Sequence, residues 1–94
     1  MYEYVIVGGG SAGCTLAHRL TEDDDVEVLL LEAGEPASDN EAVKDPSRVW
    51  ELMESDLDWA FETEPQSEMH DRRIDWPRGK ALGGSSMING MAYI

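Results

Sequence analysis

The sequence predicts an α/β fold that is incomplete as a domain. Two apolar runs, Tyr4–Val7 and Glu27–Leu31, indicate parallel strands, and the nearly unbroken apolar character of the second run suits a strand covered on both faces. A glycine-rich loop at 8–13 and a helical pattern over Ser11–Thr21 lie between them, and a second glycine-rich loop follows at 82–86. The first three features predict a right-handed strand-helix-strand unit, the beginning of a Rossmann-like domain.

The first loop carries a G-x-G-x-x-G pattern through Gly8, Gly10 and Gly13. A tight turn, close approach of a pyrophosphate and close helix-to-strand packing each exclude a Cβ atom. The following helix would aim its free N–H groups, including those of Ser11 and Ala12, and its positive dipole end at the phosphates. This loop therefore predicts a dinucleotide site.

The helix shows an apolar stripe that we expect to face the sheet. Ala12, Leu16 and Leu20 recur every four residues, with Gly13 and Ala17 beside them. An acidic run, 22–25, ends the helix.

Glu32 closes the second strand 19 residues after Gly13. A carboxylate at this position accepts hydrogen bonds from the hydroxyls of an adenosine ribose and would repel a 2′-phosphate. The alternative is an ordinary charge at a strand end. Given the strand, loop and spacing before it, we predict ribose recognition.

The segment 34–53 is rich in turn formers and predicts a loop with a short helical turn, followed by a short helix over Pro46–Met53. Asp45 or Ser47 would lie near the N-terminus of that helix. Its apolar residues include Trp50, which we expect to be buried.

A half-exposed strand is predicted over Leu57–Glu64, because apolar and polar residues alternate there. Pro65 ends it, and the turn-rich stretch that follows predicts a hairpin-like excursion before Ile74.

Four of the seven basic residues fall within 72–80, against one acidic residue, Asp75. Beside Gly83 and Gly84 they suggest an anion-facing loop with backbone N–H donors and a cation near a diphosphate. The alternative is that these cations only pair with surrounding carboxylates, which contributes little when exposed. The four cations are Arg72, Arg73, Arg78 and Lys80.

Ser85 and Ser86 are predicted to cap a short helix that starts near Met87. Asn89 and Gly90 would end that helix.

The chain carries 7 basic and 20 acidic residues and a formal charge of −13, which opposes binding to nucleic acid or to an anionic membrane. A salt-adapted source is our hypothesis for this charge.

The chain has a single cysteine, Cys14, which excludes an internal disulfide. Cys14 and His18 are too few ligands for a metal site, and His70 is expected in a solvated loop. No secretory signal or membrane-spanning run is present in the sequence, so we expect cytoplasmic residence.

Four stretches together resemble the glucose-methanol-choline (GMC) flavoprotein oxidoreductases, most closely the bacterial choline-oxidising members. The resemblance covers nearly the whole chain, and the last stretch is its most specific signature. The stretches are Tyr4–Gly13, Val28–Gly34, Trp59–Pro65 and Pro77–Tyr93.

The resemblance implies FAD as the cofactor and oxidation of a small alcohol by hydride transfer to the flavin. It implies non-covalent FAD, because Ile88 stands where some relatives carry a histidine bonded to the flavin. The catalytic histidine of the family lies far downstream, so no catalytic residue and no substrate domain is expected in this chain. Predicted cofactor contacts are Gly8, Gly10, Ser11, Ala12, Gly13, Glu32, Ala33, Arg78, Gly84, Ser85, Asn89, Gly90, Met91 and Ala92.

We accordingly expect residues 1–94 to be the N-terminal portion of a GMC-type FAD-binding domain and the front of a longer protein. Its parts would be a strand-helix-strand unit (1–34), a loop, short helix and excursion (35–76), and a flavin loop (77–94). One alternative is a non-catalytic module that needs a second chain to complete the fold. Another is a piece of a nicotinamide-dependent dehydrogenase, against which the second glycine-rich block argues.

Overall fold

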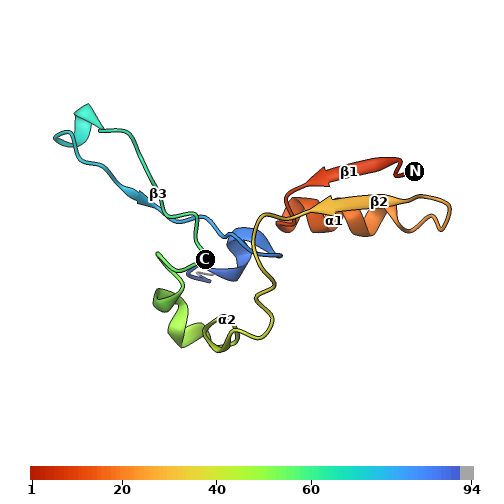
Figure 1. Ribbon diagram of the computed structural model, residues 1–94. Helices are drawn as coiled ribbons and strands as arrows, with labels where there is room; N and C mark the ends of the chain where they lie inside the picture. Colours follow the sequence, from red (N-terminus) through yellow and green to blue (C-terminus); the bar gives the residue numbers. More distant parts are fainter. Residues whose placement is uncertain (92–94) are drawn as a thin grey trace.

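The first unit is a parallel strand pair with one helix. The computed structural model describes residues 1–91 and places β1 (Tyr4–Val7), α1 (Ser11–Leu20) and β2 (Val28–Leu31) in this order. β1 pairs with β2 in parallel, from Tyr4 opposite Val28 to Val7 opposite Leu31. Figure 1 shows α1 lying along this pair. The predicted strand-helix-strand unit is thus confirmed.

Only part of the predicted apolar stripe of α1 packs inward. Gly13 is buried and Ala17 is half-buried, whereas Ala12 is exposed and Leu16 is 53% exposed. A Cβ atom at Gly13 would overlap the Gly8 carbonyl oxygen, so this side of α1 packs closely against the first loop, and residues four apart share a helix face.

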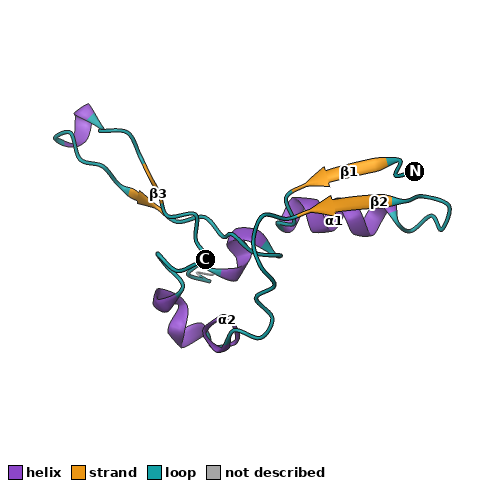
Figure 2. Cartoon of the chain, in the orientation of Figure 1, coloured by secondary structure: helices purple, strands orange, loops and turns teal. Residues whose placement is uncertain are grey.

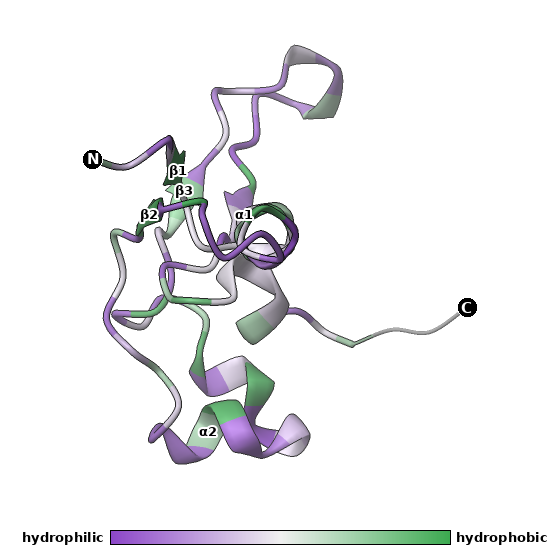
Figure 3. Ribbon diagram, turned by 90° about the vertical axis from the view of Figure 1, so that its right-hand side faces the viewer, coloured by the Kyte–Doolittle hydropathy of each residue, from purple (hydrophilic) through white to green (hydrophobic). Residues whose placement is uncertain are grey.

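The two strands are also less covered than their apolar sequence predicts. Val5 is 56% exposed and Val7 is 84% exposed, although Figure 3 shows that both strands consist of hydrophobic residues. One helix can cover only one face of a strand pair. The prediction that β2 is covered on both faces is therefore wrong for this chain, where Leu31 is 48% exposed and the other β2 residues are half-buried.

The segment after β2 forms two short helices. Asn40 Oδ1 accepts hydrogen bonds from Ala42 N and Val43 N and caps α2 (Glu41–Lys44). Asp45 then caps the 3₁₀ helix η1 (Pro46–Glu51) by accepting from Ser47 N.

Trp50 in η1 is 72% exposed, which contradicts its predicted burial. A 3₁₀ helix has three residues per turn, so Val49 and Leu52 share one face and Trp50 lies on another. Val49 and Leu52 are both buried.

The hydrophobic core cluster of the described residues contains no residue of the parallel strands. It joins the segment 37–57 to the second glycine-rich block and consists of small and medium-sized side chains. Its members are Ala37, Ala42, Leu52, Leu57, Ala81 and Ile88. This core therefore anchors the second glycine-rich block.

A narrow excursion extends from the core, as Figure 2 shows. β3 (Phe61–Glu62) pairs antiparallel with β4 (Asp75–Trp76), and the 3₁₀ helix η2 (Ser67–Met69) lies near the tip. The predicted strand over Leu57–Glu64 is shortened because Ala60 has a left-handed φ of +48°. Asp58, expected on the polar face, is buried.

The second glycine-rich block contains the 3₁₀ helix η3 (Gly84–Met87). The prediction that serines cap a helix starting near Met87 is wrong, because Gly83 precedes the helix and both serines lie inside it. Ser86 Oγ donates to the Gly83 carbonyl, and Ser85 Oγ accepts from Gly79 N.

The chain is extended, with axes of 54 × 32 × 28 Å and a radius of gyration of 16.3 Å. A compact domain of this length has a radius near ~12 Å. Its accessible surface of 7243 Å² likewise exceeds the ~5,400 Å² of a compact monomer of this mass. No helix within 1–91 has the length and apolar character to cross a membrane.

Candidate cofactor site

The two glycine-rich loops lie against each other. Gly83 N donates to the Gly9 carbonyl at 2.7 Å, and Gly10 forms an isolated parallel bridge with Gly83. Gly84 has a φ of +61°, and a Cβ there would lie 2.8 Å from Gly10 Cα. The contact therefore requires glycine, and the loops form one continuous backbone surface.

The first loop leads directly into α1. Gly8 has a φ of +96°, which permits the tight turn after β1. Gly10 precedes the helix and no side chain caps its first turn, which holds no acidic residue. The first N–H groups of α1 thus have no helical or capping acceptor and are available to an anion.

Glu32 braces the first loop. Its Oε2 accepts from Gly9 N at 2.7 Å, and its Oε1 accepts from Gly34 N at 2.9 Å. The bond from Gly34 and then that from Gly9 hold the pKa of the carboxyl below its usual value, although burial opposes them. A carboxylate offers about four lone-pair directions, so two further donors can still bind.

A groove of about 610 Å³ opens where the loops meet. Seven of the predicted contacts line it: Gly8, Gly10, Glu32, Ala33, Arg78, Gly84 and Ser85. Ser11, Ala12 and Gly13 do not line it; they form the first turn of α1 next to Gly10.

The end of the predicted flavin loop lies elsewhere. Asn89 and Met91 line a separate cavity of about 80 Å³ beside η1 and α2, and Gly90 lies between them. Asn89 Oδ1 accepts from Met91 N. Ala92 lies outside the described residues.

The four clustered cations divide into two groups. Arg78 lines the groove, with its guanidinium 4.8 Å from the Trp76 ring centroid, and Lys80 Nζ lies 5.0 Å from the Trp59 centroid. Arg73, in contrast, lies on the excursion with Arg72 and forms an ion pair with Glu62. Of these four cations, Arg78 is the one that lines the groove.

Sequence reasoning missed the aromatic wall of this groove. Trp59 and Phe61 line it and stack with ring centroids 5.8 Å apart and planes 4° apart. Both are partly exposed, at 43% and 51%. The period-2 pattern placed them on one face, but it could not show what that face meets.

Cys14 lies beside the first glycine-rich loop. Its Sγ donates to the Gly9 carbonyl at 3.1 Å. Within the described residues, no three His, Cys, Asp or Glu side chains gather closely enough to hold a metal ion.

Comparison with known proteins gives matches along the chain. A family model described as GMC oxidoreductase matches residues 2–94. An oxygen-dependent choline dehydrogenase from Proteus mirabilis is 52% identical over 96 residues, which cover 100% of this chain and 17% of that protein.

Solved structures agree in fold. Pyridoxine 4-oxidase from "Mesorbium loti" matches with a TM-score of 0.90 and 44% identity, covering 100% of this chain and 18% of that one. Formate oxidase from Aspergillus oryzae, in a variant studied for FAD modification, matches with a TM-score of 0.84 and 42% identity over 94% of this chain and 16% of that one. The chain thus spans less than a fifth of these relatives, and it belongs to the GMC oxidoreductase family.

Proposed function

We propose that this chain is the N-terminal FAD-binding part of a flavoenzyme that oxidises a small alcohol of the choline type. The observation that carries the proposal is the contact between the two glycine-rich loops around one groove. The first loop alone is compatible with several dinucleotides, whereas a second backbone loop beside it suits a longer, flavin-bearing ligand.

The residues of the groove fit FAD. The diphosphate would lie near the α1 N-terminus, where the glycine backbones of Gly10 and Gly84 leave room and the N–H groups are free. Glu32 would accept from the ribose hydroxyls with its remaining lone pairs, and Arg78 would offset phosphate charge from the opposite wall. Once bound, FAD supplies the hydride acceptor for alcohol oxidation.

This chain's own residues would bind and orient, without moving the substrate proton. His18 lies on α1 and His70 near the tip of the excursion, and neither lines the groove. The base that accepts the hydroxyl proton, and the substrate pocket, would come from the rest of the protein. We retain 1–34, 35–76 and 77–94 as the parts of this FAD-binding portion.

The test compares two variants of the full-length protein. Glu32→Gln should weaken FAD binding by about tenfold or more, because a neutral amide keeps one acceptor oxygen and turns an N–H₂ toward a backbone donor. Cys14→Ser is the control, since serine still donates to the Gly9 carbonyl. Titration of the apoprotein with FAD measures both.

Bound flavin in the unmodified protein, detected by its visible absorption, separates this proposal from a nicotinamide-dependent dehydrogenase. Binding of NAD instead of FAD would overturn it. Equal effects of the Glu32 and Cys14 substitutions would refute the roles given to these residues.

A further inference from the structure

Asp58 is a charged side chain that no part of the proposed chemistry uses. It is 7% exposed, and within the described residues it is the one polar or charged residue that is buried. Burying a carboxylate is unfavourable unless hydrogen bonds compensate it. This burial therefore calls for a structural account.

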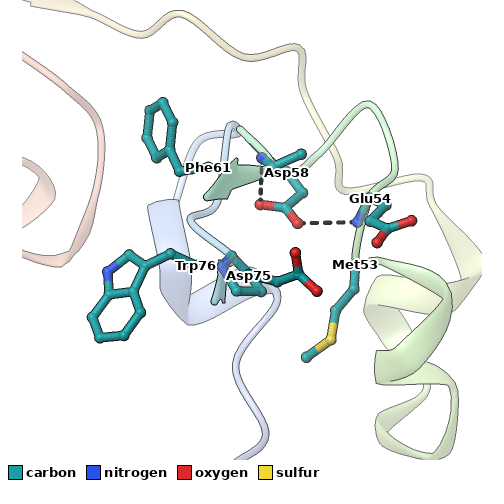
Figure 4. Close-up of a pocket in the computed structure, with 8 residues that line it drawn as sticks. Met53, Glu54, Asp58, Phe61, Asp75 and Trp76 are labelled. Carbon is teal, nitrogen blue, oxygen red and sulfur yellow. Dashed lines mark hydrogen bonds between the residues drawn. The ribbon is translucent and has the colours of Figure 1, made fainter. Parts of the chain in front are cut away.

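Three backbone N–H groups compensate the charge. Oδ1 accepts from Arg78 N at 2.8 Å and from Ala60 N at 3.0 Å, and Oδ2 accepts from Glu54 N at 3.0 Å. Figure 4 shows the carboxylate between two of these donors. Burial raises the pKa of Asp58, but the three hydrogen bonds outweigh burial and hold it below its usual value.

Two of the three donors have a backbone conformation that non-glycine residues rarely adopt. Glu54 has a φ of +59° and Ala60 a φ of +48°. Such residues persist where the surroundings hold them in place. Here the Asp58 carboxylate bonds to the N–H of each.

The same carboxylate joins the two segments that form one wall of the groove. The first segment is 59–61, in which Ala60 lies between Trp59 and Phe61. The second segment begins at Arg78. Trp59, Phe61 and Arg78 all line the groove. Backbone bonds run beside this link, from Trp59 N to the Arg78 carbonyl at 2.8 Å. Asp58 itself does not line the groove; it lies behind it, against a cavity of about 330 Å³.

We propose that Asp58 is the positioning residue of the groove wall: its carboxylate holds the aromatic segment 59–61 and Arg78 in the arrangement that receives the flavin-bearing half of FAD. This rests on the proposed function. Glu32 and the first loop serve the adenosine half and do not contact Asp58, so the two halves of the ligand should respond differently to a change at Asp58.

The test measures FAD and AMP affinities of the full-length apoprotein by calorimetry. AMP carries the adenosine half without the second phosphate or the flavin. Asp58→Asn should weaken FAD binding by about tenfold or more, because an amide cannot accept all three N–H groups, and should leave AMP binding within about twofold. Asp56→Asn, an exposed neighbour with the same chemical change, is the control and should change neither.

Rescue tests whether Asp58 acts through the backbone conformation of Ala60, whereas the unchanged AMP affinity excludes a loss of general stability. Glycine adopts a positive φ without strain, so adding Ala60→Gly to Asp58→Asn should restore at least about threefold of the lost FAD affinity. Asp58→Glu, which keeps the carboxylate, is the second variant should the asparagine variant not fold. It should show a smaller loss that is again confined to FAD.

Equal affinities in the Asp58 and Asp56 variants would overturn the proposal, as would parallel loss of FAD and AMP without rescue. A protein that folds but binds no FAD before any substitution would instead refute the proposed function. The two failures are thus distinguishable.

Discussion

Gly84→Ala should separate the two glycine-rich loops. The new Cβ would lie 2.8 Å from Gly10 Cα, whereas ordinary contacts begin near 3.4 Å. The loops must therefore move apart by about 0.6 Å, which strains the bond from Gly83 N to the Gly9 carbonyl. Because both partners are backbone, no side chain can rotate away to relieve the contact.

The magnitude follows from three contributions. An alanine in the left-handed region costs about 1–2 kcal/mol. Overpacking against a fixed neighbour costs about 1–3 kcal/mol. Alanine also lowers the conformational entropy of the unfolded chain, which stabilises the folded state by about 0.4–1 kcal/mol. We expect a net loss of about 1–5 kcal/mol in the free energy of unfolding.

Denaturant unfolding of the full-length apoprotein measures this loss, and FAD titration measures its effect on the groove, where we expect at least about tenfold weaker binding. Gly90→Ala is the stability control, because a Cβ there would meet no atom of residues 1–91 within 4 Å. It should change the free energy of unfolding by less than about 0.5 kcal/mol. Equal stability of the two variants would refute the assigned contact between the loops.

Three further predictions concern charge and the isolated chain. The pKa of Asp58 is lowered in the folded state, so the stability advantage of the unmodified protein over Asp58→Asn should be constant near neutrality and shrink below about pH 4. Urea unfolding at a series of pH values measures this advantage. An advantage that grows on acidification would contradict the prediction. The isolated 94-residue chain should lose FAD on gel filtration and reduce no dye with choline, because its surface is far larger than that of a compact domain; stoichiometric flavin with choline-dependent turnover would overturn this. Arg73→Gln should change stability by less than about 1 kcal/mol, since its ion pairs are exposed; a loss above about 2 kcal/mol would speak against that reasoning.

Local patterns predicted the first unit well. The apolar runs, the loop glycines and the residue spacing identify β1, α1 and β2. These elements can be predicted because their signals lie close together in the sequence: the apolar runs of the strands, the backbone freedom of Gly8 and the close packing at Gly13. Burial was predicted less well. Leu16 and Trp50 are apolar yet exposed, since their burial depends on which face meets another element.

The groove shows the same division between local and distant information. Glu32 was predicted from its spacing, but its two hydrogen bonds to the backbones of Gly9 and Gly34 were not, because they depend on how the turn after β1 meets the end of β2. The alternation of apolar and polar residues over Leu57–Glu64 predicted Asp58 on the polar face of a strand. Its burial follows from Arg78, twenty residues away, which brings a backbone donor to the same carboxylate.

The sequence by itself determined the family, the α/β class and the two glycine-rich loops, because residue type and short spacing encode tight turns and strand-helix-strand order. Only the tertiary structure decided that the loops touch, that Trp59 and Phe61 line a groove beside them, and that the buried Asp58 carboxylate accepts backbone hydrogen bonds from Ala60 and Arg78. These are contacts between residues distant in the chain. Backbone hydrogen bonds and close packing hold these contacts in the folded chain, and no local sequence pattern predicts them.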